Sequence, residues 1–217
     1  MKKEFSSKPD CITEQWPGMF ELFSWKDIVT AIPSPMLVVT GWKSNGKENA
    51  CLQSYASFVS DSGELVCILG WASKGGHMYR SIKETGCCVL NFPSSEIYDL
   101  CGRTIENNQF ETDEITASGL TAEKSAVVNA PRITECFLNI ECEFLWEQQN
   151  FKNSGNAVVG LKAVHFCMDS ERYDQKALGR YGKTGYLFNL HAPANPDTGE
   201  VEQDLIGMIE SIKRDSV

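Results

Sequence analysis

Hydrophobic and polar residues alternate with a period of two along residues 135–148, ECFLNIECEFLWEQ. One face of this segment carries Cys136, Leu138, Ile140, Cys142, Phe144 and Trp146. The other face carries mainly glutamate and asparagine, so the pattern predicts a long, half-buried antiparallel strand. A turn is expected at residues 153–156, NSGN, and the apolar segment 157–168 predicts a central strand buried on both faces.

Shorter apolar runs predict further strands at residues 34–42, 63–70 and 87–92. Asn45–Gly46, after the first of these strands, is typical of a hairpin turn. The segment between that turn and the second strand, NACLQSYASFVS at residues 49–60, mixes small and aromatic residues and shows no clear period. Its secondary structure therefore stays open.

Helical patterns are expected at residues 25–32, 76–86, 96–103, 171–178 and 201–214. The first is delimited by Ser24 as an N-cap and by Pro33, and the second ends at Gly86. Ser94 or Ser95 is expected to cap the third. The polar stretch 103–131 predicts a long excursion containing short helices.

Most of these strands are joined by hairpin-like turns, and they do not alternate regularly with helices. A doubly wound parallel sheet is therefore disfavoured. The pattern predicts a mainly β protein, a closed or nearly closed antiparallel barrel with peripheral helices. No repeat or break in composition divides the sequence, so a single domain is expected over residues 1–217.

The chain carries 29 acidic and 20 basic side chains, a formal net charge of -9. This balance argues against nucleic acid and anionic membrane surfaces, which bind surplus lysine and arginine. The N-terminal sequence MKKEFSSKPDC has no apolar stretch after its lysines, and no segment approaches the ~18 apolar residues of a membrane span. A cytoplasmic protein is expected.

The nine cysteines are odd in number and lie mostly in apolar, strand-like runs, and no C-x-x-C pair occurs. They are expected to be free thiols that pack in the core. The three histidines are widely spaced. His165 and Cys167 could share a strand face, but two ligands without a partner cluster do not predict a metal site. Most acidic side chains are expected on solvated faces.

The familiar nucleotide and hydrolase motifs are absent, including G-x-G-x-x-G after a strand and the P-loop. The best candidate chemistry lies in GWASKGGHMY, residues 70–79, where a strand is expected to give way to a helix. Glycines, Lys74 and a helix N-terminus can cradle an anion. A polar turn with a solvated lysine explains the same residues, and these residues alone favour the turn.

The order of segments over residues 25–170 favours the anion site over the polar turn. PSPMLVVTGW is followed by NGKENACLQSYASFVS, by GELVCILGWASKGGHMYRSIKETGCCVLNFP and later by AVVGLKAVHF. This order and spacing resemble the flavin reductase-like family of FMN-binding split barrels, in particular its flavoredoxin-type branch. The resemblance implies a six-stranded antiparallel Greek-key split barrel that forms a homodimer, with FMN bound non-covalently near each subunit interface.

The resemblance also implies which residues bind FMN. Residues 49–58 would follow the isoalloxazine ring, and Ser73 to His77 would hold the phosphate. The expected cofactor-binding residues are Asn49, Gln53, Ser54, Tyr55, Ala56, Ser57, Ser73, Lys74, Gly75, His77 and Arg80. Two positions depart from the family, because Tyr55 stands where relatives often have tryptophan or histidine, and Met78 where they often have threonine.

The implied function is that of an FMN-dependent oxidoreductase, which reduces flavin with NAD(P)H as a transient donor or passes electrons to a redox protein partner. The cofactor carries the chemistry, so no catalytic acid, base or nucleophile is predicted. Two alternatives stay open. One is a flavin-binding electron carrier with no NAD(P)H oxidase activity of its own, and the other is a non-enzymatic ligand-binding barrel.

Overall fold

The contacts within the chain divide it into two compact units. One unit comprises residues 1–34 and 188–207, and the other comprises residues 35–187 and 208–217. The computed structural model describes residues 2–173, 180–203 and 205–213. The expectation of one domain over the whole chain stays a prediction, and each unit is described by itself.

A seven-stranded antiparallel sheet forms the larger unit. Its strands are β2 (Leu37–Trp42), β3 (Glu48–Gln53), β4 (Ala56–Asp61), β5 (Glu64–Ser73), β6 (Cys87–Phe92), β9 (Leu138–Gln149) and β10 (Asn156–Met168). They are ordered β3-β2-β6-β9-β10-β5-β4 across the sheet. As predicted, β2 and β3 form a hairpin around Gly46, whose φ of 80° permits the tight turn.

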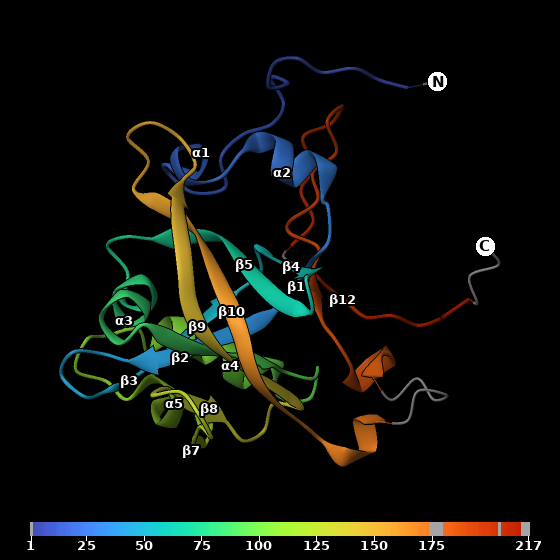
Figure 1. Ribbon diagram of the computed structural model, residues 1–217. Coiled ribbons are helices and arrows are strands. Elements are labelled where there is room, and N and C mark those ends of the chain that lie inside the picture. Colours follow the sequence, from blue (N-terminus) through green and yellow to red (C-terminus); the bar gives the residue numbers. More distant parts are fainter. Residues whose placement is uncertain (1, 174–179, 204, 214–217) are drawn as a thin grey trace. The chain divides into compact units, whose positions relative to one another are not determined.

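The sheet must close on itself, because its two outermost strands are neighbours in sequence. Only Ser54 and Tyr55 separate β3 from β4. Across a flat sheet the two strands would lie about 29 Å apart, at ~4.8 Å per strand gap, and two linking residues span only about 10 Å. The sheet therefore curls into a barrel that is split between β3 and β4 (Figure 1).

This architecture confirms the predicted mainly β, antiparallel split barrel, with a difference in strand count. Seven strands are present where six were expected, because the aperiodic segment 49–60 breaks at Ser54–Tyr55 into β3 and β4. The predicted strand 63–70 also extends further, since β5 continues to Ser73. The candidate turn at residues 70–79 therefore begins inside a strand.

The barrel interior is filled by aliphatic, aromatic and cysteine side chains from all the central strands. Helix α3 (His77–Thr85) closes one end by inserting Met78 and Ile82 into this core. The helix ends at Gly86 in the left-handed conformation, as expected. All nine cysteines are free and six of them are buried, which confirms that most serve as core residues.

The excursion between β6 and β9 contains two helices and a hairpin. These elements are α4 (Tyr98–Glu106), α5 (Glu114–Ala117), β7 (Ala122–Lys124) and β8 (Pro131–Ile133). The β7–β8 hairpin was not predicted. The predicted N-cap of the helix at 96–103, Ser94 or Ser95, was wrong, because α4 begins after Ile97 without a side-chain cap.

The smaller unit gathers short elements from both ends of the chain. These elements are α1 (Met19–Leu22), α2 (Trp25–Thr30), β11 (Phe188–Asn189) and β12 (Ile206–Gly207). Ser24 caps α2 as predicted, its hydroxyl accepting from the N–H of Lys26 at 3.2 Å. The chain also has β1 (Ser34–Pro35), and among the described residues after β10 the 3-10 turns η1 (Ser170–Tyr173) and η3 (Gly182–Thr184) belong to the larger unit.

The predicted C-terminal helix at 201–214 was wrong over the residues that the structure describes. Residues 206 and 207 pair instead with β11, and the N–H of Leu190 donates to the carbonyl of Leu205. A single short helix with Gly207 inside it is marginal on its own, and this antiparallel pairing satisfies the same backbone groups. Of the helix predicted at 171–178, only the turn η1 is seen, and residues 174–178 lie outside the described residues.

The long strand β9 has the predicted period only in part. Its pairing with β10 shifts register at Leu145, so Trp146 stands opposite Gly160 while Phe144 packs in the core. The bulge thus turns Trp146 away from the buried face to which the alternation assigned it. The opposite face is not solvated throughout either, because Glu141 is buried.

Candidate functional site

The junction between β5 and α3 forms an open backbone cradle at Ser73 to His77. The N–H of Lys74 donates to the carbonyl of Gly155 at 2.9 Å, and the N–H of Gly76 donates to Ser73 at 2.9 Å. A side chain at Gly75 would enter open space, meeting only Ser73 Oγ, at 3.9 Å. The strand end is therefore fixed, and the backbone at Gly75 is open to close approach.

Helix α3 begins there without a cap. Gly76 is the N-cap residue and offers no side chain. In the part of the chain that the structure describes, no protein group accepts from the N–H groups of His77, Met78 and Tyr79. Unpaired N–H groups and the positive end of the helix dipole at one point favour an anion.

Two cations stand near this helix start. Lys74 is half-buried and Arg80 is exposed on α3, and neither has an ion-pair partner among the described residues. Glu147 on β9 faces the same helix. Its pKa is lowered, chiefly by the hydrogen bond from Lys83 and also by Tyr79 and by the charge of Lys74. The cradle therefore has basic groups of its own in an otherwise acidic chain.

The second set of predicted residues surrounds the split between β3 and β4. The carbonyl of Tyr55 accepts from the N–H of Gly70 at 2.6 Å, and a Cβ at Gly70 would lie 3.2 Å from that carbonyl oxygen. Gly70 lies in a bulge of β5, where Ala157 and Val159 of β10 face residues 72 and 69. The bulge and its glycine let the linking residues lie close against β5.

The structure places the two predicted segments along one stretch of β5. Ala56 pairs with Leu69, and Ser73 lies four residues further along β5, a distance of about 13 Å. Residues 53–57 and 73–77 thus stand at two ends of one strand segment. Ser57 is exposed, whereas Gln53 is buried with its amide donating to Cys51 Sγ at 3.4 Å.

One predicted residue, Asn49, and one departure from the family, Met78, lie in the interior. Asn49 is only 1% exposed and pairs with Gly41, which α3 covers through Ser81. It therefore lies beneath the helix, four residues along β3 from Gln53. Met78, which stands where the family resemblance leads one to expect threonine, packs into the barrel core.

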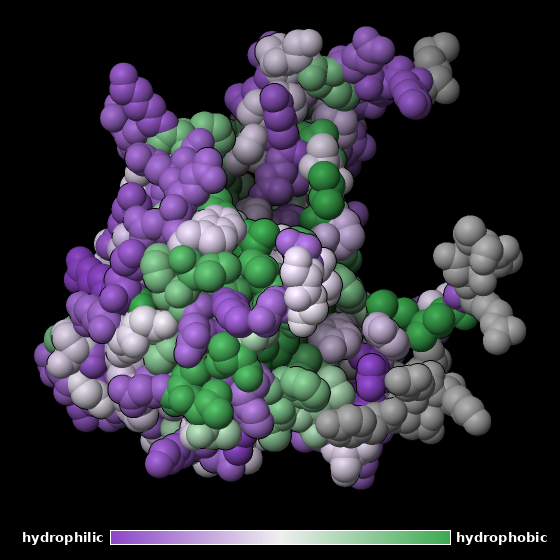
Figure 2. Space-filling view, viewed as in Figure 1, coloured by the Kyte–Doolittle hydropathy of each residue, from purple (hydrophilic) through white to green (hydrophobic). Residues whose placement is uncertain are grey.

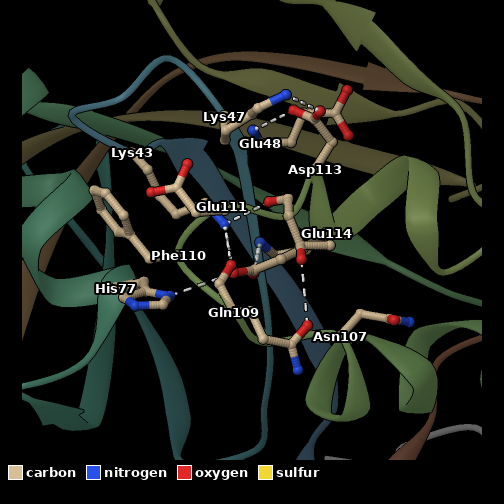
Figure 3. A network of polar contacts seen from close by, with 12 residues as sticks. Lys43, Lys47, Glu48, His77, Asn107, Gln109, Phe110, Glu111, Asp113 and Glu114 are labelled. Atoms are coloured by element: carbon tan, nitrogen blue, oxygen red, sulfur yellow. Dashed lines mark hydrogen bonds and ion pairs between the residues drawn. The ribbon is translucent and has the colours of Figure 1, made fainter.

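His77 takes part in a buried polar network that the sequence did not predict (Figure 3). Its Nδ1 lies 3.3 Å from Oε1 of Glu114, a side chain with no exposed surface. The same oxygen accepts from Lys43 Nζ at 2.9 Å, and Oε2 accepts from the N–H of Ala50 at 2.7 Å. The carboxylate thus joins the hairpin, the edge strand β3 and the start of α3.

Lys43 and Glu114 were missed because no local pattern marks them. Lys43 follows β2 and Glu114 opens α5, in a polar stretch 71 residues away. A lysine beside a hairpin turn and a glutamate in a polar excursion are typical of solvated surfaces. Only the fold shows that each neutralises the other in the interior.

Among residues 2–173, 180–203 and 205–213, no group of three or more His, Cys, Asp and Glu side chains is arranged to hold a metal ion. Over the same residues, no helix combines the length and apolar character needed to cross a membrane.

The family profile described as flavin reductase like domain matches residues 29–178, and the chain belongs to this family. Among curated proteins, one of Methanothermobacter thermautotrophicus (strain Delta H), described as an uncharacterized protein, is 25% identical over 145 residues, covering 66% of this chain and 67% of its own.

Solved structures share the fold at lower identity. Nitrilotriacetate monooxygenase component B from Bacillus cereus has a TM-score of 0.70 at 16% identity, covering 94% of this chain and 98% of its own. Flavoredoxin of Desulfovibrio vulgaris (Miyazaki F) has a TM-score of 0.68 at 15% identity, covering 94% and 97%. The family membership supports a flavin-related oxidoreductase role and flavin binding.

Proposed function

We propose that this protein is an FMN-dependent oxidoreductase that binds the flavin phosphate at the start of α3. The observation that carries the proposal is the uncapped helix N-terminus behind Gly75, with Lys74 beside it. A phosphate monoester dianion suits this place because it accepts several N–H bonds at once and pairs with a lysine.

The length of the site suits FMN as a whole. FMN has a planar ring at one end and a phosphate at the other, and the two predicted segments lie about 13 Å apart along β5. Ser54 to Ala56 would lie along the ring, where backbone amides can stabilise negative charge on the reduced flavin. Ser73, Gly75 and Lys74 would hold the phosphate, with Arg80 assisting.

When bound, FMN supplies the group that accepts hydride from NAD(P)H and releases electrons, so the chain needs no acid or base for that step. The role of the protein residues is to bind and orient. The cradle fixes the phosphate end, and the β3–β4 linker, held to β5 through Tyr55 and Gly70, sets the position of the ring end.

The experiment measures flavin binding to the purified apo protein through the quenching of flavin fluorescence. Lys74→Ala should weaken FMN binding by about 10- to 100-fold, because a hydrogen bond to a charged group contributes ~1.5–3 kcal/mol. Riboflavin, which lacks the phosphate, should bind both proteins equally. Lys124→Ala, at an exposed position on β7, is the matched control. A wild-type protein that binds no flavin would refute the proposal.

A second candidate is an electron carrier that holds FMN but does not oxidise NAD(P)H by itself. It is favoured by the absence of any dinucleotide fingerprint in the sequence. Steady-state oxidation of NADH and NADPH in the presence of FMN separates the two. Turnover with either nucleotide excludes the carrier, and no turnover by a flavin-loaded protein supports it.

We also propose that the protein is a homodimer, and that the outer face of β4, β5, β9 and β10 is its interface. This face carries exposed apolar side chains, namely Val59, Leu145, Trp146 and Val164. Figure 2 shows hydrophobic residues gathered in the region where β9 and β10 run. The free cysteines fit a reducing compartment, and we place the protein in the cytoplasm.

A further inference from the structure

The carboxylate of Glu114 contacts the side chain of His77, which lies at the start of α3 beside the proposed phosphate site. His77 is the first residue of α3, and its side chain is 19% exposed. Its Nδ1 faces the Glu114 carboxylate at 3.3 Å (Figure 3). The two nitrogens of an imidazole point in roughly opposite directions, so Nε2 points away from Glu114.

We propose that Glu114 is a positioning residue for His77. It accepts the Nδ1–H bond of a ring that carries a proton on both nitrogens when the anion binds, so that the Nε2–H donates to a ligand at the start of α3. The proposal rests on the proposed function, since the ligand in question is the flavin phosphate. The family resemblance implies His77 as a phosphate contact and gives no reason for its orientation.

The charge of Glu114 must be neutralised for this role, because a free carboxylate so close to the cradle would repel a phosphate. Lys43 provides the counter-charge, with its Nζ 2.9 Å from Glu114 Oε1 and a side chain that is 1% exposed. Its other two donors reach the carbonyls of Gln109, at 2.9 Å, and Thr112, at 2.6 Å. All three N–H groups of Lys43 are thus used within the protein.

His77 is also restrained from a second side. The ring of Phe110 meets it edge-on, with 5.7 Å between centroids. The Phe110 carbonyl in turn accepts from Asn45 Nδ2 at 2.9 Å, so the hairpin holds the loop that carries this ring. An imidazole fixed between Phe110 and Glu114 binds an anion with little loss of side-chain entropy.

The test compares FMN with riboflavin, because their difference isolates the phosphate. His77→Gln should lower FMN affinity about tenfold, the effect of losing one hydrogen bond to a charged group, and leave riboflavin affinity unchanged. Glu114→Gln should lower FMN affinity in the same way without touching the ligand. The double variant should be no worse than His77→Gln alone. His165→Gln, a histidine on β10, is the control and should bind as the wild type does.

Glutamine at 114 cannot serve all its present partners, because Oε1 and Oε2 both accept and one would become a donor. If Glu114→Gln fails to fold, the variant Lys43→Met with Glu114→Leu removes both charges together, an exchange that buried ion pairs often tolerate. Either variant should lose the FMN preference. Urea unfolding of each variant shows that its binding is measured on folded protein.

Nitrogen-15 spectra of the histidine side chains give a readout that needs no flavin. The His77 signal, identified by its loss in His77→Gln, should show protonation at Nδ1 in the wild type and not in Glu114→Gln. An unchanged FMN-to-riboflavin ratio, or a His77 ring protonated at Nε2 alone in the wild type, would overturn the proposal. Absence of flavin binding by the wild type would instead refute the proposed function, so the two failures are distinguishable.

Discussion

At the scale of single residues, the most consequential side chain outside the candidate site is Glu141. It lies on β9 with 1% of its surface exposed, at a position where alternation predicts a solvated face. Its carboxylate accepts three backbone N–H bonds, from Ala126 at 2.7 Å, Val127 at 2.8 Å and Val128 at 3.1 Å. One charge thereby holds the loop before β8 against the barrel.

This arrangement predicts a pH-dependent contribution to stability. Burial by itself raises the pKa of Glu141, but the three N–H donors outweigh it, and the pKa is lowered overall. A folded-state pKa below the unfolded value of about 4.3 stabilises the protein above that pH. The contribution is then lost as the pH falls through the folded pKa.

Glu141→Gln should therefore cost about 1–3 kcal/mol at pH 7, since one of the two acceptor oxygens is lost in a buried place. The difference in the free energy of unfolding between the wild type and Glu141→Gln should become smaller below about pH 4.3. Urea unfolding at a series of pH values measures this difference. Glu143→Gln, at an exposed position two residues along β9, should change little at any pH. A gap that stays constant down to acid pH would contradict this account.

At the scale of elements, the sequence predicts best where the pattern is local. The period of two indicates β9, and the glycines around His77–Thr85 delimit α3, because one strand or one helix decides those residues. The break between β3 and β4 depends on closure of the whole sheet, and the final strand β12 depends on its pairing with β11. Neither is encoded in a local pattern.

The candidate site divides in the same way. Ser73 to His77 could be proposed from the sequence because a strand, two glycines and a helix follow one another there, and because the order of segments around them resembles the flavin reductase-like family. Glu114 could not, because it reaches His77 across 37 positions through the fold of a polar excursion. Asn49 belongs to the predicted segment, but pairing with Gly41 turns it beneath α3.

The register shift in β9 makes a prediction about how the two longest strands pack. The indole of Trp146 lies against Gly160, and a Cβ there would stand 2.6 Å from its Nε1 and Cδ2 atoms. Gly160→Ala should destabilise the protein by about 1–3 kcal/mol, as overpacking does, in urea unfolding. Gly155→Ala, where a Cβ meets nothing within 4 Å, should cost far less.

A double-mutant cycle identifies the cause of that cost. In a Trp146→Leu background, Gly160→Ala should lose most of its effect, because the smaller side chain leaves room for the new methyl group. If the cost of Gly160→Ala is the same in both backgrounds, the strain lies in the backbone of β10 and the indole contact is not its source.

At the scale of the whole molecule, the proposed homodimer needs an interface that limits the repulsion between two acidic chains. Two copies, each with a net charge of -9, repel one another, and salt reduces that repulsion. On the outer face of the sheet, Leu145 is 49% and Val164 is 37% exposed on adjacent strands. Lys162, on the same stretch of β10, is paired with Glu64 at 2.8 Å and stands opposite Glu143 on β9. A basic side chain thus lies between the carboxylates of this otherwise apolar patch, which reduces the repulsion between two acidic subunits.

Light scattering coupled to size-exclusion chromatography should therefore give the mass of two chains for the wild type at micromolar concentration. Val164→Lys or Leu145→Lys should give the mass of one chain, because burying an unpaired ammonium at the centre of the interface costs several kcal/mol. Ile105→Lys, at a 65% exposed apolar position on α4, is the control and should stay dimeric. A single-chain mass for the wild type, or dimers that persist in both lysine variants, would show that this face is not the interface.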